Sequence, residues 1–220
     1  MTLTPGLRRF TFTTHVTSSC GWVGAVIVFL ALAVIGLTSD DEATVRGAYL
    51  VMAPAAWFVL VPLAHASFLS GMVLSLGTAW GLFRHYWVVL KLLITAFATV
   101  ILLIYMETFR GMADVAADPV AALGLVRNPS PVVHAILALI LLLLATALAV
   151  YKPFGMTPYG RRKHAEQGGA SALYVPAAAA PHRGLAMSTP RWRYTAGVVA
   201  AIIVLLLFAL LHFTGTGVQH

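Results

Sequence analysis

Charged side chains are scarce in this sequence. Asp, Glu, Lys and Arg together make up 10% of its 220 residues, whereas soluble domains carry about 25%. Such a chain has too little polar surface to cover a water-soluble globule. Cysteine is almost absent as well, because Cys20 is the single one. One thiol excludes an internal disulfide framework and a four-thiolate zinc site.

Long apolar runs are what the sequence has instead. Hydrophobic residues make up 60% of the chain, and its mean hydropathy is +0.89. A helix that crosses a bilayer needs about 20 mostly apolar residues, and five stretches reach that length. The sequence therefore predicts an all-α, polytopic membrane helix bundle with five transmembrane helices, over residues 13–37, 47–76, 87–108, 131–151 and 194–213.

The predicted second span is longer than a straight crossing requires. It covers 30 residues, and Pro54 and Pro62 lie inside it. We expect tilt, an interfacial extension or bends at the two prolines to absorb the excess.

The lysines and arginines predict the orientation. If the N-terminus is inside, 11 of the 14 basic residues lie on the inner side, and only Arg46, Arg110 and Arg127 lie outside. This bias follows the positive-inside rule and places the C-terminus outside. It also accounts for the formal charge of +7, so a nucleic-acid partner is not indicated and the expected surroundings are the lipid bilayer.

The spans divide the chain into three parts. Residues 1–151 form a predicted four-helix transmembrane bundle, and residues 194–220 form the fifth helix with a short external tail. Between them, residues 152–193 combine the basic run Arg161–His164 with the small-residue tract VPAAAAPHRG, which predicts a flexible cytoplasmic loop. The basic run either contacts anionic lipid headgroups or only satisfies the positive-inside rule.

Metal-ligating side chains gather at the outer ends of the spans. Imidazole with thioether is a ligand set that suits copper(I), whereas imidazole with carboxylate admits zinc or iron. The alternative is that these side chains meet headgroups or fill gaps. The candidate metal ligands are His134, His212, Glu107 and Met106, with Met52 and Met112 nearby.

Two histidines lie toward the inner side of adjacent spans. His15 begins the first span, and His65 lies in the inner half of the second. If the two helices pack together, the imidazoles can hold a b-type haem between them. The alternative is that His65 bonds a serine or a backbone carbonyl. Lys91, about one turn into the third span, is expected to extend to the inner interface in a structural role.

Two segments resemble a known family. The stretch from Ser70-Gly71 through Gly-Thr-Ala-Trp-Gly (77–81) to Lys91 resembles the core pattern of CopD-like (copper resistance D) membrane domains. The segment from His15 to Gly21-Trp22-Val23-Gly24 is similar to the first helix of that superfamily. The longer strings around both segments resemble uncharacterised prokaryotic multi-pass membrane proteins of this type. Together the segments cover about residues 12–110.

The resemblance implies a four-helix membrane bundle in a prokaryotic cell (inner) membrane. It reaches His15, Trp22, Gly71 and Lys91 individually, but not His134 or His212. Copper handling or transport is the implied activity, and related bundles that bind haem through a first-helix histidine imply a haem-b redox protein as an alternative. A structural or assembly subunit without chemistry is the third hypothesis. An enzyme is not indicated, because the sequence contains no HExxH motif and no phosphate-binding glycine loop.

The predicted orientation can be tested with reporter fusions. A reporter placed after His220 should be accessible from outside the cell, and one inserted at Gly168 should be accessible only from the cytoplasm. The reverse labelling at both positions would contradict the five-span topology.

Overall fold

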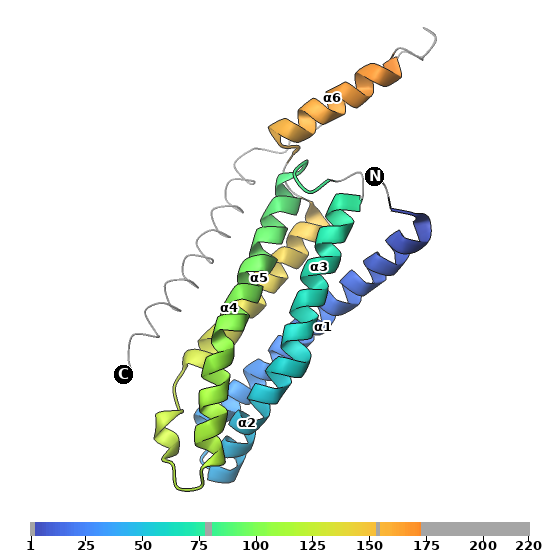
Figure 1. The fold of residues 1–220 in the computed structure, drawn as a ribbon. Helices are drawn as coiled ribbons and strands as arrows, with labels where there is room; N and C mark the ends of the chain where they lie inside the picture. The colour runs from blue at the N-terminus through green and yellow to red at the C-terminus, as the bar shows by residue number, and fades with distance from the viewer. Residues whose placement is uncertain (1–2, 78–80, 153–154, 173–220) are drawn as a thin grey trace.

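The described part of the chain is helical throughout. The computed structural model describes residues 3–77, 81–152 and 155–172, and these contain helices and no strand. Figure 1 shows the long helices running side by side as a bundle. The elements are α1 (Pro5–Thr38), α2 (Glu42–Ala55), the π-helix η1 (Ala56–Leu60), α3 (Val61–Gly77), α4 (Tyr86–Ala117), the 3-10 helix η2 (Leu123–Leu125), α5 (Ser130–Tyr151) and α6 (Pro158–Ala172).

Four of the predicted spans are confirmed within the described residues. The helices Pro5–Thr38, Glu42–Gly77, Tyr86–Ala117 and Ser130–Tyr151 are long and apolar enough to cross a membrane. They contain the predicted stretches and extend most of them by several residues. The predicted fifth span, residues 194–213, lies outside the described residues. The start of α1, the end of α3, the start of α4 and the end of α5 share one end of the bundle, which we call the inner end after the predicted orientation.

The second span is one continuous helix that changes its hydrogen-bonding pattern in the middle. α2 passes into η1 and then into α3 without a break. Pro54 lies inside α2, and Pro62 is the second residue of α3, so η1 occupies the stretch between them. Each proline lacks a backbone N–H and cannot complete the regular helical ladder. A π-helical turn is a known response to such a disturbance inside an α-helix.

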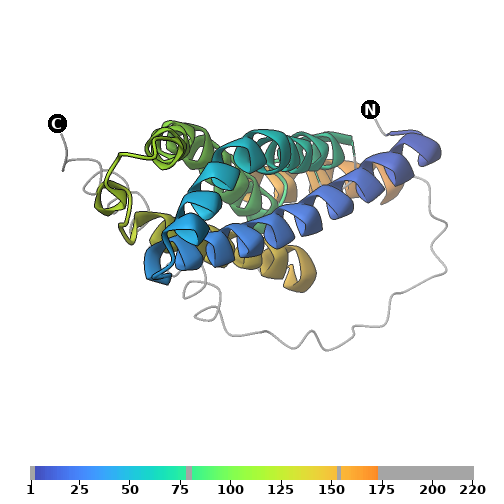
Figure 2. The ribbon, with the colours of Figure 1, turned by 90° about the horizontal axis from the view of Figure 1, so that it is seen from below.

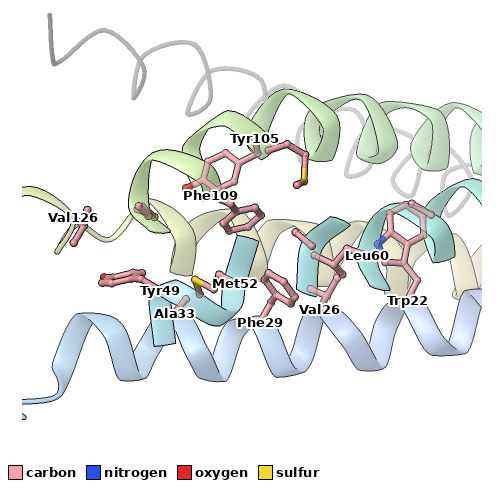
Figure 3. Packing of buried hydrophobic residues seen from close by; sticks show 14 of the residues in the cluster. Trp22, Val26, Phe29, Ala33, Tyr49, Met52, Leu60, Tyr105, Phe109 and Val126 are labelled. Carbon is pink, nitrogen blue, oxygen red and sulfur yellow. The ribbon is translucent and has the colours of Figure 1, made fainter. Parts of the chain in front are cut away.

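The core lies between α1 and the helices that surround it. α1 packs against α3 and α5, α2 packs against α4, and α5 contacts α4 as well, as Figures 1 and 2 show. Buried residues of α1 recur every three or four positions, which places Trp22, Val26, Phe29 and Ala33 on one face. Figure 3 shows this face meeting residues of α2, η1 and α4.

Aromatic side chains close the outer half of the core. The Phe29 and Phe109 rings meet edge to face with centroids 5.4 Å apart, and Tyr105 meets Phe109 at 5.0 Å. Such edge contacts stabilise a core beyond the area they bury. On the outside of the bundle, large apolar side chains such as Val28, Phe58 and Leu143 are exposed, as a lipid surrounding requires.

Arg46 ties the outer ends of α2 and α4 together. Its guanidinium donates to Glu42 Oε1 at 2.6 Å and reaches across to the end of α4 and the residues after it. The backbone oxygens it meets belong to Ala116 at 3.3 Å, Asp118 at 2.6 Å and Ala121 at 3.0 Å. The last carbonyls of a helix have no partner within the helix, and a positive charge there is favourable. Arg46 therefore caps α4 from a neighbouring helix.

Asp41 begins α2 on the same side of the bundle. Its carboxylate accepts hydrogen bonds from the hydroxyl and the backbone N–H of Thr44, the latter at 2.9 Å. These bonds hold the pKa of Asp41 below its usual value, the hydroxyl bond contributing most. The residue serves as the N-terminal cap of α2.

At the inner end, the sequence did not predict α6. Thr157 precedes this helix and accepts from the Gly160 N–H at 3.0 Å, as an N-terminal cap does. The same hydroxyl donates to the Phe83 carbonyl at 2.6 Å, and the Thr157 N–H donates to the Arg84 carbonyl at 2.9 Å. The beginning of α6 is thus hydrogen-bonded to the segment that leads into α4.

The Arg46 cap yields a stability prediction. Arg46→Ala should lower the free energy of unfolding by about 2 kcal/mol, because the substitution removes charge-assisted bonds to several carbonyls. Thermal unfolding in detergent measures the effect. Arg110→Ala is the matched control: this side chain pairs with Glu107 but is 55% exposed, so its loss should change stability by less than about 0.5 kcal/mol. Equal losses in the two variants would contradict the role of Arg46.

Candidate functional site

Polar side chains enter the core of the inner half from three helices. The buried hydroxyls there include Ser67 and Ser70 of α3 and Thr95 and Thr99 of α4. Most of them donate to a carbonyl one turn earlier in their own helix, as Thr99 does to Thr95 at 2.8 Å. A hydroxyl satisfied in this way is tolerated in an apolar core, and its oxygen can still accept another hydrogen bond.

His15 of α1 is held by the backbone of α3. Its Nδ1 lies 3.0 Å from the Ser67 carbonyl oxygen and 3.2 Å from Ser70 Oγ. A carbonyl oxygen only accepts, so Nδ1 carries a proton and donates it. In the neutral ring the lone pair therefore lies on Nε2. Hydrogen bonding to α3 thus fixes which nitrogen of His15 can accept a proton.

Lys91 of α4 meets that accepting nitrogen. Its Nζ lies 3.1 Å from His15 Nε2. The sequence predicted a structural role for Lys91 at the inner interface, whereas the structure places its ammonium group on the imidazole. Both side chains line a small cavity of about 10 Å³ beside this contact, and its lining contains no Asp or Glu among the residues that the structure describes. Lys91 thus has an imidazole rather than a carboxylate as its partner.

The end of α3 offers a physical reason why a cation is tolerated here. Gly71 and Ser75, which line the cavity with Lys91, belong to the last two turns of α3. The C-terminal end of a helix carries a partial negative charge that favours a nearby cation. This contribution is modest, on the order of 1 kcal/mol, and supplements the hydrogen bond to His15.

Gly71 allows α3 to approach the imidazole. A Cβ atom at this position would lie 3.0 Å from His15 Cε1, which is closer than a carbon atom tolerates without movement of its neighbour. One turn away, the Ser19 and Ser67 hydroxyls are 2.7 Å apart and link α1 to α3 a second time. Small residues permit such close packing between membrane helices, and hydroxyls add hydrogen bonds across the contact.

His65 lies elsewhere on α3. Its Nδ1 is 2.8 Å from the Val61 carbonyl of its own helix, so the bond is to a backbone oxygen, one of the alternatives left open by the sequence. Ser67 is two positions after His65, and two positions correspond to a rotation of about 200° around an α-helix. The ring therefore lies on a different face from the serines that hold His15. The structure does not bring the two histidines together, and haem ligation by them stays a prediction.

The predicted metal ligands at the outer ends of the spans are also kept apart from one another. Glu107 is exposed and pairs with Arg110 at 3.1 Å, while Met106 is buried in the core. No group of three or more His, Cys, Asp or Glu side chains that could hold a metal is found among the described residues. His212 lies outside them. The proposed ligand set His134, His212, Glu107 and Met106 is thus not assembled by the described part of the chain, and metal binding stays a prediction.

His134 instead borders an apolar cavity in the outer half of the bundle. This cavity has a volume of about 60 Å³, and Met52, Trp22 and Phe29 are among the residues that line it. The His134 ring stacks on Tyr105 with centroids 4.3 Å apart. The Tyr105 hydroxyl and the Ser130 hydroxyl are 2.9 Å apart, and His134 Nδ1 is 2.8 Å from the Ser130 carbonyl. Among the outer candidates that the structure describes, Met52 and His134 are thus the imidazole–thioether pair that shares this cavity.

Four residues of the inner site are among those on which the CopD-like resemblance rests. His15, Ser70, Gly71 and Lys91 come from three helices and meet at one place. Ser67, Ser75 and Thr95 were missed by sequence reasoning. A signal for the first two exists, because Ser67, Gly71 and Ser75 recur every four residues and, with Ser70, form a stripe of small and polar residues.

Comparisons with protein-family models, with curated proteins and with solved structures find no match for this chain. The geometry of the site is therefore what indicates a function.

The close approach at Gly71 yields a second prediction. Gly71→Ala should displace the His15 ring and change the ¹⁵N chemical shifts of its imidazole, measured by NMR on histidine-labelled protein in bilayers. Gly24→Ala is the matched control, because a Cβ added there meets nothing within 4 Å. A glycine-to-alanine change in a helix ordinarily stabilises it by up to about 1 kcal/mol, so the control should be at least as stable as the wild type. Unchanged His15 shifts in Gly71→Ala would show that the contact does not constrain the ring.

Proposed function

We propose that this protein is a proton-linked membrane carrier that binds and releases a proton at the His15–Lys91 pair. The observation that carries the proposal is the distance of 3.1 Å between Lys91 Nζ and His15 Nε2, inside two spanning helices. Ionisable side chains at membrane depth are costly and mark ion and proton pathways. A purely structural link between helices needs only hydroxyls, as Ser19 and Ser67 illustrate.

The geometry of the pair favours one shared proton. Two nitrogens at this distance form a hydrogen bond only if one of them donates and the other accepts. Since His15 Nδ1 donates to the Ser67 carbonyl, the pair holds a proton either as lysine ammonium with neutral imidazole or as neutral amine with imidazolium. A second proton would place two positive charges side by side away from water. The pair therefore gains and loses one proton as a unit.

The CopD-like resemblance supports placing this proton exchange in a transport protein. Ser70, Gly71 and Lys91, which carry the resemblance, contact or closely approach the His15 imidazole. Copper is the cargo that the resemblance implies. The Lys and Arg bias supports a cytoplasmic position for the inner end, in the inner membrane of a prokaryotic cell.

Proteoliposomes test the proposal. Vesicles containing the purified protein and an internal pH indicator are given a potassium diffusion potential, with and without copper(I) under reducing conditions. We expect protein-dependent proton entry in at least one arm, reduced at least tenfold by Lys91→Met. Lys163→Met is the matched control, since Lys163 is exposed on α6 and pairs with Glu166, and it should keep the wild-type rate.

The two arms distinguish the forms of the proposal. Entry that depends on copper supports CopD-like copper transport, and entry without copper shows that the His15–Lys91 pair conducts protons without a copper cargo. If neither arm exceeds empty vesicles, or if Lys91→Met matches the wild type, the proposed function is wrong.

A further inference from the structure

The small cavity beside Lys91 has the size and the lining of a water site. Its volume of about 10 Å³ corresponds to roughly one water-sized sphere. A buried water also needs two to four polar partners. Lys91, Ser75 and Thr95 supply them from two helices, and His15 and Ser67 complete the polar side of the lining.

The hydrogen bonds of these side chains leave a matching set of donors and acceptors. The Ser75 hydroxyl donates to the Gly71 carbonyl at 2.7 Å, and the Thr95 hydroxyl points to the Lys91 and Leu92 carbonyls at 3.1 Å. Both oxygens are therefore available as acceptors. Lys91 has three N–H groups as an ammonium, and His15 takes one of them. A water here accepts from Lys91 and donates to Ser75 and Thr95.

The cavity lies toward one end of the bundle. Ser75 is two residues before the end of α3, and Val88, another lining residue, is in the first turn of α4. In the opposite direction the Thr99 hydroxyl is bonded to the Thr95 carbonyl, the Ser19 and Ser67 hydroxyls are bonded to each other, and Ala64 is fully buried. Ser75 thus leads from the cavity toward the inner end, whereas the hydroxyls on the deeper side have partners within the bundle.

We propose that this cavity binds a single water molecule that relays protons between Lys91 and the inner end of the bundle. The inference rests on the proposed function and adds the route by which the proton enters and leaves. In the outward step, an N–H bond of the Lys91 ammonium breaks and its proton moves to the water. The water passes one of its own protons to Ser75 Oγ. The Ser75 hydroxyl then breaks its hydrogen bond to the Gly71 carbonyl and releases its original proton to bulk water. Lys91 is left as a neutral amine, and no electron is transferred.

Water-edited solid-state NMR on the full chain in lipid bilayers tests the site. The sequence contains only three lysines, so ¹⁵N-lysine labelling gives few signals, and Lys91→Met identifies that of Lys91. We expect magnetisation to pass from water to Lys91 Nζ in the wild type. Thr95→Val keeps the side-chain shape but removes the acceptor, and should reduce this transfer at least threefold.

Thr99→Val is the matched control. It removes a buried hydroxyl of the same type, one turn deeper and outside the cavity lining, and should leave the transfer at the wild-type level. Absence of transfer in the wild type, or an equal transfer in Thr95→Val, would overturn the water site. Bound water without Lys91-dependent proton entry would overturn the proposed function and leave the water site standing. Proton entry without bound water would overturn the relay alone.

Discussion

A polar group inside the hydrocarbon core has to find its hydrogen-bond partners within the protein, and the inner half of this bundle is arranged around that constraint. The bond between His15 and the Ser67 carbonyl shows how it is met. A backbone oxygen of one helix orients a side chain of another, and that orientation fixes which ring nitrogen faces Lys91. Without the Ser67 carbonyl, either ring nitrogen of His15 could carry the proton. The donor and the acceptor in the contact between His15 Nε2 and Lys91 Nζ would then not be fixed.

The outer end meets the same constraint with permanent charges. Arg46 satisfies carbonyls at the end of α4, and the Arg127 guanidinium donates to the Ser39 carbonyl at 2.7 Å, which joins the segment before α5 to the end of α1. An arginine stays protonated under ordinary conditions. The charges of Arg46 and Arg127 at the outer end are therefore constant. In the proposed function, by contrast, the contact between His15 and Lys91 contains a proton that can move. The bundle thus combines a fixed end with an end that can change its charge.

The sequence predicted the spans but only part of the site. Four spans follow from the length and hydropathy of their apolar runs, which are properties of each segment by itself. Which residues meet depends on the rotation of each helix about its axis, and an apolar run in lipid encodes that rotation weakly because all its faces are hydrophobic. His15 and His65 were both predicted toward the inner side of adjacent spans, with His65 the deeper, yet α3 turns Ser67 and Gly71 toward α1 instead.

The residues quoted for the CopD-like resemblance include four that meet in the inner site, namely His15, Ser70, Gly71 and Lys91. Lys91 illustrates the limit of reasoning from position alone. A lysine one turn into a span reaches the interface by default, and only the location of His15 on a neighbouring helix changes its partner. α6 was missed because polar helices without an apolar face carry little sequence signal.

The π-helical turn has a consequence for how the second span should be compared with other sequences. A wider turn holds an additional residue, so everything after Leu60 is out of phase by about one residue, or about 100°, with a regular α-helix that continued from α2. The polar stripe that begins at Ser67 therefore points about 100° away from the direction it would have on a regular α-helix that continued from α2. A homologue that lacks one residue between Pro54 and Pro62 would align well on either side of the gap, yet only one of the two halves could keep its neighbours.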